Sequence, residues 1–123
     1  MRQDYSEERL GQQLPHLNAE ELAELRDAIE CLVHVLRPER IYAFGSQARG
    51  TPASDSDVDL LVVVPESDLP PYRLAQIAYR AVSPHLKPLD IIVMTRGEFD
   101  SRKPARASLP ATVLREGRLL YAS

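Results

Sequence analysis

Residues 42–64 read YAFGSQARGTPASDSDVDLLVVV, and this stretch decides the fold that we expect. A short apolar run ends at Gly45-Ser46, and a polar connection leads to Asp57 and Asp59, which open a second, longer apolar run. In a strand, residues i and i+2 point to the same face roughly 7 Å apart, so the two carboxylates project together. Like charges repel one another, and burial would add to the cost. A cation held between Asp57 and Asp59 would offset this cost. The residues alone leave one alternative open, in which both are exposed turn residues at the start of a strand.

The composition is that of an ordinary globular protein, with 123 residues, 44% hydrophobic and 27% charged. This length allows one domain with one core, which we assign to residues 18–123, and residues 1–17 are expected to be a loosely ordered lead-in. No apolar run approaches a membrane span, and the charged N-terminus does not resemble a signal peptide. With Cys31 as the one cysteine, the chain cannot form an internal disulfide. We therefore expect a cytoplasmic protein without membrane contact.

The formal net charge of −3 argues against a dedicated nucleic-acid binder. The three histidines, His16, His34 and His85, lack the spacing of metal ligands. Surface or core positions are the expectation for all three.

Apolar spacing and capping residues predict most of the secondary structure. The predicted elements are a helix over 19–36, strands over 41–44 and 58–64, a helix over 68–83, a strand over 89–94, a helical segment over about 109–116 and an edge strand over 118–121. Thr95 and Glu98 are spaced to cap a short helical turn, and residues 99–107 look irregular. Tyr72 and Tyr79, on the second helix, are expected to be packing residues.

Strand 58–64, helix 68–83 and strand 89–94 form a βαβ unit, whose strands are parallel. Asp90 then lies at the same edge of the sheet as Asp57 and Asp59. Strand 41–44 must deliver Gly45-Ser46 to that edge, so it runs antiparallel to its successor. The result is an α+β (α/β) fold with a mixed three-to-four-stranded sheet packed with helices.

The segment from Gly45 to Gly50 supplies a second half of the expected site. Glycine lets the backbone approach a ligand closely, and Ser46 can cap a short helix whose free N–H groups bind an anion. Phosphate at this helix start, with its other oxygens on aspartate-held metal, is an arrangement for a nucleoside triphosphate. It differs from a Walker A loop, because no Gly-Lys-Ser/Thr follows.

With these residues the chain resembles the minimal nucleotidyltransferases of the polymerase-β-like superfamily. The signature of that family is Gly-Ser, ten residues and then Asp-x-Asp, and it is matched here by Gly45-Ser46 and Asp57-Val58-Asp59. Its fuller form, GSxARG followed by SDxDLxV, is matched by residues 45–50 and 56–62. The third family carboxylate falls on Asp90, and REGRLLY (115–121) is similar to the close of these small proteins.

The resemblance implies nucleotidyl transfer with ATP as substrate and two Mg²⁺ ions as cofactors. Asp57, Asp59 and Asp90 would be the catalytic and metal-binding residues, and Asp90 would also help to deprotonate the attacking hydroxyl. Gly45 and Ser46 would bind the terminal phosphates. Two interpretations of Arg49 remain open. It would contact either the phosphate or the acceptor, or else it would form a structural salt bridge.

Many minimal members of this family are antitoxins encoded beside a HEPN-domain toxin, a helical RNase. The resemblance implies that this chain transfers AMP to a tyrosine of such a toxin, with which it would form a hetero-oligomer. Two alternatives remain open at this point. One is an antitoxin that acts by binding alone, and the other is a nucleotidyltransferase for a small molecule of the aminoglycoside type.

Overall fold

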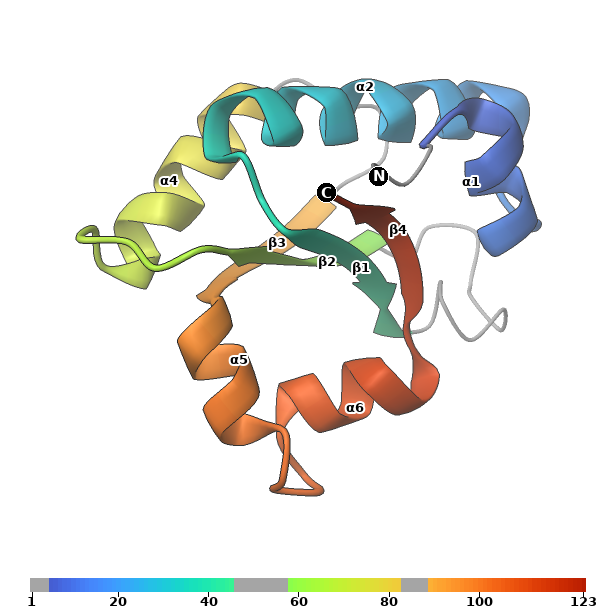
Figure 1. The fold of residues 1–123 in the computed structure, drawn as a ribbon. Coiled ribbons are helices and arrows are strands. Elements are labelled where there is room, and N and C mark those ends of the chain that lie inside the picture. Colours follow the sequence, from blue (N-terminus) through green and yellow to red (C-terminus); the bar gives the residue numbers. More distant parts are fainter. Residues whose placement is uncertain (1–4, 46–57, 83–88) are drawn as a thin grey trace.

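The structure, a computed structural model, describes residues 5–45, 58–82 and 89–123. Within these residues a four-stranded sheet lies between two layers of helices (Figure 1). The strands are β1 (Arg40–Phe44), β2 (Val58–Val64), β3 (Leu89–Thr95) and β4 (Arg118–Ala122). The helices are α1 (Glu7–Gln13), α2 (Ala19–Leu36), α4 (Pro71–Val82), α5 (Arg96–Arg102) and α6 (Leu109–Glu116).

The sheet is mixed, with the strand order β3-β2-β1-β4. Strand β1 pairs antiparallel with both β2 and β4, whereas β2 and β3 are parallel. The predicted α+β fold with a mixed sheet is therefore confirmed, including the reversal between the first two strands. As expected, β1 and β2 are interior and β4 is an edge strand.

Helices α2 and α4 cover one face of the sheet, and α1 packs beside α2 (Figure 1). Helix α2 begins with a capping box, in which Asn18 Oδ1 accepts from Glu21 N (2.8 Å) and Glu21 Oε1 accepts from Asn18 N (2.9 Å). Such reciprocal caps satisfy amide groups that the first helical turn leaves unpaired. None of the described helices combines the length and the apolar composition that crossing a membrane requires.

Helices α5 and α6 cover the opposite face of the sheet (Figure 1). Successive side chains of β2 point to opposite faces of the sheet and pack against both helix layers. Leu60 and Val62 join the core beneath α2, while Leu61 and Val63 pack with Phe99 of α5. All four of these β2 side chains are completely buried. This explains why β2 is apolar on both faces. By the same alternation, Asp59 belongs to the face that carries Leu61 and Val63.

The structure differs from the sequence prediction in the lead-in. Residues 7–13 form α1, capped by Ser6, whose side chain accepts from Arg9 N at 3.3 Å. Leu10 and Leu14 are fully buried, so this segment is packed rather than loose. The helix has only seven residues, so it contains too few apolar side chains to show helical spacing in the sequence.

A second difference concerns the segment that was expected to be irregular from residue 99. Thr95 caps α5 as expected, with its side chain accepting from Glu98 N, but the helix continues to Arg102. Phe99 is completely buried and stacks on Tyr42 with ring centroids 6.0 Å apart. Burial of one aromatic ring thus stabilises a helix that local propensity does not predict.

Candidate functional site

Asp59 and Asp90 face each other across the parallel pair β2–β3. The register pairs Asp59 directly with Asp90, next to the pairs Val58–Leu89 and Leu60–Ile91. Directly paired residues of neighbouring strands point to the same face of a sheet, with the strands about 4.8 Å apart. Asp59 is half-buried and Asp90 is exposed. Two carboxylates thus meet at the N-terminal end of both strands, where the crossover connection was expected to place them.

Gly45, which directly follows β1, lies against Asp59 of this acidic pair. Its φ of +76° belongs to the left-handed region that favours glycine. A β-carbon added at this position would overlap Oδ2 of Asp59 and lie 3.3 Å from its Cγ. A side chain at position 45 would therefore require Asp59 to shift, and the backbone conformation also favours glycine. The Gly-Ser segment starts beside a carboxylate, as the sequence pattern indicates.

Three of the expected site residues, Ser46, Arg49 and Asp57, lie outside the described residues. Asp59, Asp90 and Gly45 are consequently the part of the candidate site whose geometry is visible. Within residues 5–45, 58–82 and 89–123, no group of three or more His, Cys, Asp or Glu side chains is arranged to hold a metal ion. Asp57 is the third carboxylate of the site that the sequence predicts, and it stays a prediction.

Tyr79 of α4 also belongs to this site, although the sequence indicated only a packing residue. Its hydroxyl accepts a hydrogen bond from Ile91 N at 2.7 Å and donates one to Oδ1 of Asp90 at 3.2 Å. The side chain remains 42% exposed, so it is not part of the core. The signal available in the sequence was its place on the crossover helix, which must pass alongside the strand that carries Asp90.

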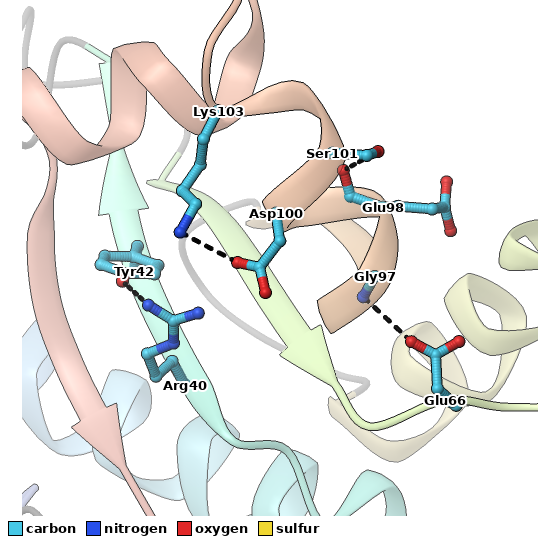
Figure 2. Close-up of polar contacts among 8 residues, drawn as sticks. All are labelled: Arg40, Tyr42, Glu66, Gly97, Glu98, Asp100, Ser101 and Lys103. Atoms are coloured by element: carbon cyan, nitrogen blue, oxygen red, sulfur yellow. Dashed lines mark hydrogen bonds and ion pairs between the residues drawn. The ribbon is translucent and has the colours of Figure 1, made fainter.

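The far end of the parallel pair is joined by a separate contact. Gly97 N, at the start of α5, donates to Oε1 of Glu66 at 3.0 Å (Figure 2). Glu66 follows β2 and Gly97 follows β3, so this bond connects the two C-terminal ends. It supports the same register that places Asp59 opposite Asp90.

The cationic side chains around α5 lie away from the acidic pair and make structural contacts. Arg40, at the opposite end of β1 from Gly45, donates to the hydroxyl of Tyr42 at 2.8 Å (Figure 2). Its guanidinium also lies 4.8 Å from the ring centroid of Phe99. Lys103 pairs with Asp100 at 3.1 Å on the helix surface. None of these contacts brings a positive charge to Asp59 or Asp90.

Comparisons with known proteins agree with this arrangement. A family model described as "Nucleotidyltransferase domain" matches residues 22–120, which include every residue of the candidate site. The comparison with curated proteins gave no match.

Two solved structures are similar to the chain. One is described as "Crystal structure of the toxin-antitoxin with AMP-PNP", with 24% identity, a TM-score of 0.46, and coverage of 78% of this chain and 72% of that chain. The other, from Sulfolobus solfataricus, is named as a candidate nucleotidyltransferase. It shows 26% identity and a TM-score of 0.43, covering 61% of this chain and 79% of that one.

Proposed function

Since the chain belongs to the nucleotidyltransferase domain family, we propose that it transfers AMP from ATP to a tyrosine of a HEPN-domain toxin. The chain would act as the antitoxin, in a hetero-oligomer with that toxin in the cytoplasm. The partner and the acceptor are inferred from the likeness of GSQARG (45–50) and SDVDLLV (56–62) to the minimal antitoxin branch. The transfer chemistry is inferred from the family, and the geometry of the site supports it.

The observation that carries the chemistry is the direct pairing of Asp59 with Asp90 beside the backbone of Gly45. Like charges directly opposite on neighbouring strands destabilise a sheet unless something neutralises them. Oxygen donors from a few carboxylates, completed by substrate phosphates, are the set that Mg²⁺ prefers. Asp59 and Asp90 therefore fit part of a magnesium site, and Asp57 would be its third protein ligand.

Bound Mg²⁺ would supply charge stabilisation for both the entering and the leaving oxygens of the transfer. The tyrosine oxygen of the acceptor attacks the α-phosphorus of ATP, and the bond from that phosphorus to the β-phosphate oxygen breaks. Pyrophosphate leaves, and the carboxylate of Asp90 takes the proton of the attacking hydroxyl. Asp90 suits this role because it is the more exposed of the two described carboxylates.

The triphosphate would lie along the Gly-Ser segment. Gly45 has no side chain between its backbone and Asp59, so a phosphate can approach both. Ser46 would bind the terminal phosphates together with neighbouring amide groups. Arg49 would contact a phosphate oxygen.

Transfer of radiolabel tests this function directly. The purified chain is incubated with ATP labelled at the α-phosphate, Mg²⁺ and the proposed HEPN-domain partner. We expect the label on a tyrosine of the partner, and we expect Asp57→Asn or Asp90→Asn to abolish the transfer. An exposed carboxylate away from the site provides the matched control, Asp68→Asn, which should transfer label normally.

Two other outcomes would replace the proposal with one of its alternatives. If Asp57→Asn still protects cells from the toxin, the chain neutralises its partner by contact alone. If the label appears on an aminoglycoside and not on the partner, the acceptor is a small molecule.

A further inference from the structure

Tyr79 makes two hydrogen bonds through one hydroxyl group, and they join three elements of the fold. The backbone N–H of Ile91 donates to the hydroxyl at 2.7 Å. The hydroxyl in turn donates to Oδ1 of Asp90 at 3.2 Å. Helix α4 is thereby connected both to the backbone of β3 and to the carboxylate that β3 presents to the candidate site.

The direction of these bonds follows from the chemistry of a phenol. A tyrosine hydroxyl has one proton to donate and lone pairs that accept. An amide N–H can only donate, so the Ile91 bond uses a lone pair and orients the hydroxyl proton toward an acceptor. The acceptor that it reaches is Asp90, and hydrogen bonds to charged groups are about twice as strong as neutral ones. The carboxylate of Asp90 is therefore oriented by the Tyr79 hydroxyl, and the Ile91 amide in turn orients that hydroxyl.

The position of the phenol is set by buried neighbours on the same helix. Leu74, Ala78 and Val82 anchor α4 in the core, and Ala78 is completely buried next to Tyr79 in the chain. Strand β3 ends the sheet on this side, so the Ile91 amide faces an open edge where the phenol can reach it. Within the described residues, no hydrogen bond is made by Oδ2 of Asp90, so this oxygen remains available to a ligand.

We propose that Tyr79 is a positioning residue, which fixes the carboxylate of Asp90 so that Oδ2 is presented to a divalent cation shared with Asp59. This inference rests on the proposed function, because it assigns Asp90 to a metal site. Hydrogen-bond partners of metal ligands orient those ligands, and their loss costs about 10–100-fold in metal affinity or activity. For a partly exposed tyrosine we expect the lower end of that range, about tenfold.

The test measures the affinity of the full chain for Mn²⁺. Electron paramagnetic resonance monitors this binding, and no transfer reaction takes place during the measurement. Tyr79→Phe removes only the hydroxyl and should weaken Mn²⁺ binding by about tenfold. The matched control is Tyr72→Phe on the same helix, since Tyr72 is 65% exposed and makes no polar contact with the described residues. That control should bind Mn²⁺ as the wild type does.

A double variant separates positioning from a merely structural role. In the Asp90→Asn background, Tyr79→Phe should produce no further loss, because the residue that it positions has already been changed. In activity assays the Mg²⁺ concentration for half-maximal label transfer should rise, while KM for ATP at saturating Mg²⁺ stays within about twofold.

Wild-type Mn²⁺ affinity in Tyr79→Phe, alongside a loss in Asp90→Asn, would overturn the inference about Tyr79 and leave the proposed function standing. An equal tenfold loss in Tyr72→Phe would also overturn it. Unchanged binding in both Asp57→Asn and Asp90→Asn would overturn the metal site itself, and with it both proposals.

Discussion

The backbone of Gly45 lies against the carboxylate of Asp59, so closely that a β-carbon at position 45 would overlap Oδ2. Gly45→Ala must therefore displace Asp59 while also holding alanine at a φ of +76°. Left-handed backbone costs a non-glycine residue about 1–2 kcal/mol, so we expect the free energy of unfolding to fall by that amount. Label transfer should fall by about tenfold or more, because Asp59 is misplaced.

A second glycine provides the control for this prediction. Gly11 lies in α1, where an added β-carbon would only touch Cδ1 of Leu22 at 3.4 Å. Gly11→Ala should raise the free energy of unfolding by about 0.5–1 kcal/mol, because alanine is the better helix former. Urea denaturation measures both variants. Equal changes in the free energy of unfolding for Gly45→Ala and Gly11→Ala would show that the contact between Gly45 and Asp59 does not affect stability.

Charge repulsion between Asp59 and Asp90 predicts an unusual dependence of stability on magnesium. In EDTA the two carboxylates repel one another across paired strands, which costs about 0.2–1 kcal/mol. Asp90→Asn should then be as stable as the wild type or slightly more stable. With Mg²⁺ at ten times its dissociation constant, the wild type should gain about 1.4 kcal/mol and the variant much less.

Thermal unfolding with and without Mg²⁺ checks this prediction. Asp68→Asn, at an exposed position between β2 and α4, should respond to Mg²⁺ as the wild type does. A variant Asp90→Asn that loses more than about 1 kcal/mol in EDTA would show that this carboxylate stabilises the fold without a cation.

The sheet and its acidic edge could be predicted because strong general rules connect them to the sequence. The apolar runs of β2 and β3 enclose a helix, and such crossovers leave strands parallel, which places Asp90 beside Asp59. The short connection after Gly45 then requires the reversal of β1. These conclusions depend on chain geometry and not on side-chain detail.

The elements that sequence did not predict depend on tertiary contacts. Helix α1 is too short to show a period, and it is stabilised by burying Leu10 and Leu14. The second turn of α5 depends on Phe99 stacking with Tyr42. Tyr79 was missed because its partners, Asp90 and Ile91, meet it only after α4 has packed against the edge of the sheet.

The bond between Glu66 and Gly97 predicts a modest loss of stability without a change in the metal site. Glu66→Ala removes the acceptor of Gly97 N and should lower the free energy of unfolding by about 0.5–1 kcal/mol, since the bond is exposed. Glu66→Gln retains an acceptor oxygen and should lose less. Mn²⁺ affinity should be unchanged in both variants, because buried β2 residues such as Val62 also hold the register. A loss of Mn²⁺ binding in Glu66→Ala would mean that this contact alone sets the register.

The packing of α1 predicts that the N-terminal segment contributes substantially to folding. Leu10 is completely buried among core side chains, so Leu10→Ala should lower the free energy of unfolding by about 2–5 kcal/mol. Glu8→Ala, on the exposed side of the same helix, should change it by less than about 0.5 kcal/mol. Urea denaturation of the two variants gives the comparison. If Leu10→Ala were as mild as Glu8→Ala, the segment would be the loosely ordered lead-in that its sequence indicates. A large difference requires that α1 be part of the folded core, because only a buried leucine leaves a cavity when it is shortened.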